Sequence, residues 1–147
     1  MWFIMTVRLA TAADWSAIHT LNTTSLGYDF PVEKAQAALR RVLSAPGHTL
    51  LVITDNQNQI QGYVHVENYL TTYCDPMYNV LALAVAPSSQ GRGYGRQLMT
   101  AIEKFAGQHK IRAIRLNSGS KRLAAHAFYE HLGYQSSKMQ KRFIKWL

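Results

Sequence analysis

The chain has 147 residues, of which 48% are hydrophobic and 16% are charged, and its formal net charge is +8. This balance indicates one globular domain, residues 1–147, and argues against a disordered chain. No apolar run approaches the roughly 18 residues that cross a bilayer, so we expect no membrane partner. The apolar start, residues 1–5, lacks a basic leader, which favours a cytoplasmic protein. Because Cys74 is the only cysteine, an internal disulfide and a thiolate-rich metal site are excluded.

The first half of the chain predicts a strand, then two helices, then two further strands. Apolar spacing, turn residues and a capping box formed by Thr11 and Asp14 define these elements. They are a strand at Ile4–Leu9, a helix from Asp14 that ends before Gly27, a helix from Pro31 that ends at residues 45–47, and strands at Thr49–Thr54 and Gln59–Tyr69.

The second half predicts a central strand, a glycine-containing loop and four further elements. After the loop, apolar residues spaced by three and four indicate a helix from Tyr94 to near Gly107. The central strand is Val80–Val85, and the later elements are a strand at Ile111–Asn117, a helix at about Lys121–His131 and a final strand from Ser136 onward. A strand that follows a helix in this way suggests parallel pairing with the central strand.

The loop between the central strand and its helix has the composition of an anion site. Gly91, Gly93 and Gly95 alternate there, and glycine allows a ligand to approach the backbone closely. The first turn of a helix presents unpaired N–H groups and a positive dipole end, beside which Arg92 and Arg96 add full charges. The spacing lacks the third glycine of a dinucleotide fold and the Gly-Lys-Ser/Thr of a P-loop.

Two motifs resemble those of the GCN5-related N-acetyltransferase (GNAT) superfamily. Gln90-x-x-Gly93-x-Gly95 matches the family's acetyl-CoA motif, and AHAFYEHLGY at residues 125–134 resembles its C-terminal segment. The resemblance implies an α/β (α+β) fold with a central mixed, mostly antiparallel sheet. It also implies a splayed parallel strand pair and about four flanking helices.

The resemblance further implies acetyl-CoA as co-substrate and no metal. The main chain near Leu83, Ala84 and Val85 would pair with the pantetheine arm, while Asn117 and Phe128 would flank its thiol end. The pyrophosphate would be held by Gln90, Gly91, Arg92, Gly93, Tyr94, Gly95 and Arg96.

Tyr129 matches the general acid of the family, which protonates the departing CoA thiolate. A tyrosine with a reference pKa of about 10 holds its proton at neutral pH and can give it to a thiolate. The base departs from the family pattern, because the central strand has no carboxylate. Glu67 is the first substitute for it, with His65, Asp29 and Asp75 as alternatives. His126 and His131 follow no metal-binding pattern.

The acceptor is expected to be a primary amine of a small molecule or peptide. The resemblance places it against Tyr28, Asp29 and Phe30 and against Tyr78, and aromatic rings with an acid suit a cationic amine. A non-catalytic CoA-binding sensor or interaction module of the same fold is the alternative. No nucleic-acid-binding motif accompanies the basic composition, so we expect no nucleic-acid partner. Whether the chain forms a homodimer stays open.

Overall fold

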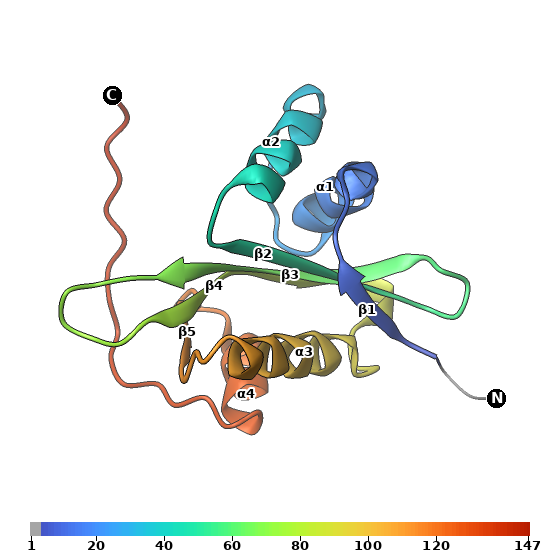
Figure 1. The fold of residues 1–147 in the computed structure, drawn as a ribbon. Helices are drawn as coiled ribbons and strands as arrows, with labels where there is room; N and C mark the ends of the chain where they lie inside the picture. The colour runs from blue at the N-terminus through green and yellow to red at the C-terminus, as the bar shows by residue number, and fades with distance from the viewer. Residues whose placement is uncertain (1–3) are drawn as a thin grey trace. The chain divides into compact units, whose positions relative to one another are not determined.

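A five-stranded mixed sheet organises the fold of the computed structural model, which describes residues 4–147. Residues 1–3 of the apolar start lie outside this description. The strands are β1 (Thr6–Leu9), β2 (His48–Thr54), β3 (Ile60–Tyr69), β4 (Met77–Val85) and β5 (Ile114–Leu116). They lie in sequential order, and every neighbouring pair is antiparallel except β4–β5, which is parallel (Figure 1). The predicted mixed, mostly antiparallel sheet is thereby confirmed.

Four α-helices accompany the sheet in the described residues. They are α1 (Trp15–Thr24), α2 (Val32–Ser44), α3 (Tyr94–Gln108) and α4 (Leu123–His131). The chain divides into two compact units, Met1–Leu116 and Asn117–Leu147, and α4 belongs to the second. Within the first unit, Figure 1 shows α1 and α2 on one face of the sheet and α3 on the other. No helix of the described residues is both long and apolar enough to span a membrane.

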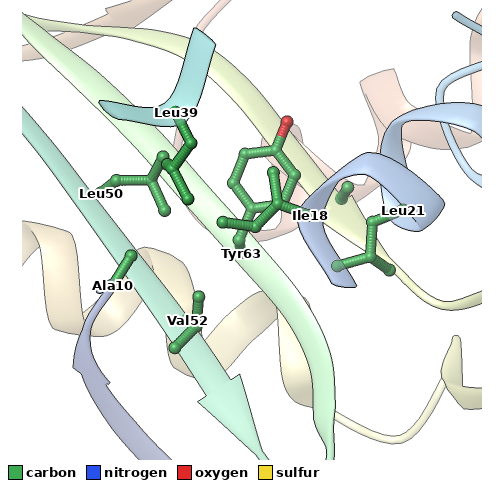
Figure 2. Close-up of a cluster of buried hydrophobic side chains, with 8 residues drawn as sticks. Ala10, Ile18, Leu21, Leu39, Leu50, Val52 and Tyr63 are labelled. Atoms are coloured by element: carbon green, nitrogen blue, oxygen red, sulfur yellow. The ribbon is translucent and has the colours of Figure 1, made fainter. Parts of the chain in front are cut away.

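The alternation of side chains along the strands builds a core on each face of the sheet. On the face of α1 and α2, Ile18, Leu21 and Leu39 pack with Leu50, Val52 and Tyr63 of the strands (Figure 2). Leu98, Met99 and Ile102 of α3 are fully buried, as are Ile53 and Val64. Tyr63 and Val64 are adjacent in β3 and point to opposite faces.

The predicted capping box precedes α1. Asp14 accepts a hydrogen bond from the backbone N–H of Thr11 at 2.8 Å. A short 3₁₀ turn at Ala12–Asp14 leads into the helix. Local sequence therefore defines this helix start, as expected.

The predicted final strand from Ser136 onward is wrong. Residues 134–147 form neither helix nor strand, and Met139, Phe143 and Trp146 are 82%, 89% and 85% exposed. Apolar residues of this segment occur at both odd and even positions, Phe143 next to Ile144 for example, so an extended chain would present no single apolar face. Other strands differ in length: β5 spans three residues rather than the predicted seven, β4 begins at Met77 rather than at Val80, and β1 begins at Thr6 rather than at Ile4.

Candidate active site

The pairing of β4 leaves part of its backbone edge open. On one side β3 pairs with β4 as far as Val85. On the other side the pairing with β5 stops where Val80 faces Leu116, so residues 81–85 have no strand partner there among the described residues. Leu81 forms a bulge, since His65 faces Ala82 and Val66 faces Val80. Such an edge offers backbone N–H and C=O groups to an extended ligand, and it includes the predicted Leu83, Ala84 and Val85.

The glycine loop follows this edge and opens α3. Gly91 and Gly93 have φ angles of +78° and +91°, and a Cβ on either would meet no atom within 4 Å. No side chain caps the start of α3. Arg92 and Arg96 are exposed and form no ion pair with another described residue. The first turn of α3 therefore combines unpaired N–H groups with two cationic side chains, as an anion site requires.

Side-chain hydrogen bonds connect the segment after β4 to β3 and β4, and one from Ser25 also binds the end of β4. The carbonyl oxygen of Val85 accepts hydrogen bonds from Ser25 Oγ at 2.7 Å and Gln90 Nε2 at 3.3 Å. Ser89 Oγ donates to Gln61 Oε1 at 2.6 Å. The predicted ligand Gln90 thus supports the loop, and the carbonyl of Val85 already has two donors. Tyr94, 2% exposed, packs in the core, so only its backbone is available to a ligand.

A pocket of about 120 Å³ lies between α1, α2 and the sheet. The predicted acceptor residue Phe30 lines it, and His19 Nε2 contacts the carbonyl oxygen of Phe30 at 2.8 Å. The remaining lining residues are Trp15, Ile18, Asn22, Ala35, Ala38, Leu39, Val42, Leu50, Tyr63 and His65, of which Figure 2 shows Ile18, Leu39, Leu50 and Tyr63. The hydroxyl of Tyr63 is hydrogen-bonded to Asn22 Oδ1, and burial raises its pKa.

The other predicted acceptor residues do not line this pocket. Tyr28 is 60% exposed and Asp29 is also exposed. Tyr78 is only 4% exposed, because it lies in β4 beside β5, where its backbone N–H bonds Ala113, and burial raises its pKa. The structure thus brings Phe30 of a loop together with Trp15 of α1 and with Tyr63 and His65 of β3.

Glu67 belongs to a chain of polar contacts across β3, β4 and β5. Asn79 Nδ2 donates to Glu67 Oε2 at 3.1 Å, and Arg115 Nη1 donates to Asn79 Oδ1 at 2.7 Å. The guanidinium carbon of Arg115 lies 4.5 Å from the centroid of the Tyr69 ring. Sequence reasoning missed these partners of Glu67, since they depend on the strand register.

His65, two residues before Glu67, forms a second contact. Its Nε2 lies 3.0 Å from His48 Nδ1 of β2. Burial and the neighbouring His48 lower the pKa of His65 to about 4, although the charge of Glu67 opposes the shift. His65 is therefore neutral at pH 7 and can accept a proton.

The second unit contains the predicted Asn117, Phe128 and Tyr129. The Tyr129 ring meets Phe128 and Tyr134 edge-on, with centroid distances of 5.2 and 6.0 Å. Burial raises the pKa of the Tyr129 hydroxyl, and Arg122 partly opposes this. A tyrosine in this state keeps its proton at neutral pH and is suited to act as an acid.

No group of three or more histidine, cysteine, aspartate or glutamate residues in the described part of the chain could hold a metal ion. In the second unit, His126 Nε2 instead contacts the carbonyl oxygen of Gly119 at 2.8 Å.

Comparisons with known proteins agree with this architecture. A family model described as an acetyltransferase (GNAT) domain matches residues 46–136, more than half of the chain. The structure of AAC(6')-Iy in complex with a bisubstrate analogue, CoA-S-monomethyl-acetylneamine, has a TM-score of 0.84 at 16% identity and covers 98% of this chain and 99% of that chain.

Two further structures share the fold. An aminoglycoside antibiotic 6'-N-acetyltransferase from Acinetobacter baumannii has a TM-score of 0.82 at 16% identity, over 98% of this chain and 99% of that chain. A transcriptional regulator from Bacillus halodurans has a TM-score of 0.82 at 25% identity, over 97% of this chain and 100% of that chain.

Proposed function

This chain belongs to the GNAT acetyltransferase family, and from that premise we propose that it moves the acetyl group of acetyl-CoA to a primary amine of a small molecule or peptide. The observation that carries the proposal is the open backbone edge at residues 81–85, which leads into the glycine loop and the uncapped start of α3. The extended pantetheine arm of acetyl-CoA fits the open edge, and its pyrophosphate fits the loop and the start of α3.

This fit pairs each part of acetyl-CoA with the residues that would bind it. The edge at Leu83, Ala84 and Val85 would bind the pantetheine arm through the main chain. The loop from Gln90 to Gly95 would hold the pyrophosphate through backbone N–H groups, with Arg92 and Arg96 supplying charge. Asn117 and Phe128 are proposed to flank the thiol end. Acetyl-CoA supplies the activated acyl group as a thioester.

In the proposed reaction the amine nitrogen attacks the thioester carbonyl carbon directly. A C–N bond forms, the C–S bond breaks, and the CoA thiolate takes the hydroxyl proton of Tyr129, which solvent then restores. The nitrogen loses one proton to a base, for which Glu67 is the carboxylate that the sequence offers. Its hydrogen bond from Asn79 holds it on β3 while leaving its second oxygen available.

The proposed acceptor region comprises Tyr28, Asp29, Phe30 and Tyr78. The pocket beside Phe30 combines three aromatic rings with few charges, a setting that suits an amine carried on an apolar or ring-shaped body. Structural neighbours that are aminoglycoside acetyltransferases support including aminoglycosides among the candidates. A cytoplasmic location stays part of the proposal.

Replacing Tyr129 with Phe should lower kcat by roughly 10²-fold, because the thiolate then has no positioned acid. The Kd for CoA should change little, since the ring remains. Thiol release monitored at saturating acetyl-CoA measures the first quantity, and calorimetry measures the second. Tyr134→Phe, which removes a hydroxyl from the neighbouring ring, is the matched control and should retain activity. A Tyr129→Phe enzyme with wild-type turnover would remove Tyr129 from the mechanism.

The proposed function is tested by incubating the protein with acetyl-CoA and a panel of alkylamines, polyamines, aminoglycosides, amino-acid derivatives and lysine peptides. Amine-dependent thiol release, with an acetylated product seen by mass spectrometry, supports the proposal and identifies the acceptor. Binding of CoA without transfer to any amine would favour the alternative, a non-catalytic CoA-binding sensor or interaction module.

A further inference from the structure

A pair of hydrogen-bonded histidines connects two neighbouring pockets of the first unit, which share Val42 and Leu50 in their linings. His65 lines the 120 Å³ pocket beside Phe30. His48 lines a second, larger pocket of about 250 Å³ formed with Leu9, Ala10, Val42, Leu43, Thr49 and Leu50. His65 Nε2 and His48 Nδ1 lie 3.0 Å apart, and the ring centroids lie 5.2 Å apart. The two imidazoles therefore form a polar connection between the pockets.

The register places His65 beside the central strand at its bulge. His65 faces Ala82, which lies directly before the predicted cofactor edge at Leu83–Val85. Bulges commonly re-aim side chains next to active sites. The central strand itself offers no carboxylate, so a titratable group on β3 opposite Ala82 can take the position of the missing base.

We propose that His65 accepts the proton that the acceptor amine loses and passes it to His48, which releases it to solvent through the larger pocket. This inference rests on the proposed acetyl transfer, and it assigns the proton of the amine to His65 in place of Glu67. Nδ1 of His65 has no hydrogen-bond partner among the described residues, so its lone pair can face the amine when Nε2–H donates to His48 Nδ1.

The proton balance of this route closes. The acceptor attacks as the free amine, after its ammonium proton has passed to solvent. It gives one further proton to His65 Nδ1 as the C–N bond forms, and the proton of His65 Nε2 passes to His48 Nδ1. His48 then loses its Nε2 proton to water. One proton leaves the amine, one enters solvent, and exchange of the tautomers between turnovers restores both neutral rings.

The surroundings of His65 keep it neutral between turnovers. The titratable groups near it are His48 on β2, Tyr63 and Glu67 on β3 and His19 on α1, whereas α2 lines the pocket only with Ala35, Ala38, Leu39 and Val42. Burial lowers the pKa of His65 to about 4, so the ring does not retain the proton at pH 7. Glu67 stabilises the transient imidazolium through its charge.

The experiment compares two acceptors that differ mainly in basicity: the alkylamine turned over fastest in the panel and its O-alkylhydroxylamine analogue. Both acceptors attack as the free base, but the charged nitrogen of the alkylamine adduct is a much weaker acid than that of the hydroxylamine adduct. The hydroxylamine therefore needs less help from a base. His65→Gln should lower kcat roughly 10²-fold with the alkylamine and little with the hydroxylamine. His48→Gln should lower it in the same direction but less. His109→Gln, on an exposed histidine bonded to its own helix, is the matched control and should match wild type.

Each other outcome overturns the inference in a distinct way. Equal losses with both acceptors would show that the pair only shapes the pocket. If His65→Gln keeps the wild-type kcat, and Glu67→Gln loses kcat with the alkylamine but not with the hydroxylamine, the carboxylate of Glu67 is the proton acceptor. Wild-type rates in His65→Gln and Glu67→Gln alike would exclude both residues. If wild-type protein acetylates no amine at all, the proposed function falls and this inference falls with it.

Discussion

At the scale of single residues, Asp14 shows how a buried charge is held. It is 7% exposed, and its carboxylate accepts hydrogen bonds from both terminal nitrogens of Arg8, at 2.8 and 3.0 Å. The backbone N–H of Thr11 adds a third at 2.8 Å. The hydrogen bonds from Arg8, followed by the one from Thr11, hold the pKa of Asp14 below its ordinary value of 3.8 despite its burial. The capping box thus also ties β1 to the start of α1.

Replacing Asp14 with Asn should destabilise the protein by about 1–3 kcal/mol at pH 7, because the amide loses the charge-assisted bonds. The contribution of Asp14 is complete above the unfolded pKa and disappears as pH falls through the lower folded pKa. The difference between wild type and variant should therefore shrink at pH 3. Urea unfolding at both pH values measures it. Asp75→Asn, at an exposed position, is the control. A loss of stability in Asp14→Asn that is the same at both pH values would show that the charge of Asp14 is not what stabilises the protein.

The contact between His48 and His65 is a second feature of single residues. The sequence offers His65 as an alternative base and gives His48 no role, and no motif joins residues so far apart. Only the pairing of β2 with β3, in which His65 faces Leu50, brings the rings within hydrogen-bonding distance.

At the scale of elements, β3 can pack under α3 because Gly62 has no side chain. A Cβ there would lie 2.7 Å from the carbonyl oxygen of Ala84 and 3.2 Å from Leu98 Cδ1. The backbone angle of Gly62 is not in the left-handed region, so space is the reason for this glycine. Gly93 is the opposite case: open space surrounds it, and its φ of +91° requires glycine.

Gly62→Ala should cost about 1–3 kcal/mol, the usual penalty for overpacking, because the obstructing atom is backbone. Gly107→Ala is the matched control: this glycine lies in α3 with no atom within 4 Å of a Cβ, so the added methyl should stabilise the helix by up to about 1 kcal/mol. Thermal or urea unfolding of both variants measures the contrast. Equal effects of the two changes on stability would mean that the backbone near Gly62 shifts without cost to accommodate the added methyl group.

At the scale of the whole molecule, the net charge of +8 matches a ligand that carries several phosphate charges. Long-range attraction between exposed charges weakens as salt shortens the Debye length from about 10 Å at 0.1 M to 3 Å at 1 M. The excess of basic residues should therefore favour binding of CoA at low ionic strength.

The Kd for CoA should rise several-fold between 0.05 and 0.5 M NaCl, measured by calorimetry. Arg92→Gln should raise the Kd about tenfold at low salt, since a charge-assisted contact contributes roughly 1.5–3 kcal/mol. It should also flatten the salt dependence. Arg40→Gln, an exposed residue of α2, changes the net charge equally and should alter the Kd little. Equal effects of the two variants would indicate net charge alone, without an anion site at α3.

The sequence by itself determined the order of the elements from β1 to α4, the capping box at Thr11–Asp14 and the family motifs around Gly93 and Tyr129. These features are local: helix and strand periodicity, turn chemistry and loop spacing are all set by residues near one another in the chain. The fold class that the motifs implied is confirmed, and the residue roles they implied remain proposals.

The tertiary structure decided what depends on strand register and burial. It left residues 134–147 without the expected strand, buried the side chain of Tyr94, and set Asn79 against Glu67. It also assembled one pocket from Phe30, Trp15 and His65, which lie on a loop, a helix and a strand. The physical reason is that a side chain's neighbours across a sheet are fixed by the pairing of whole strands, which no single segment of sequence specifies.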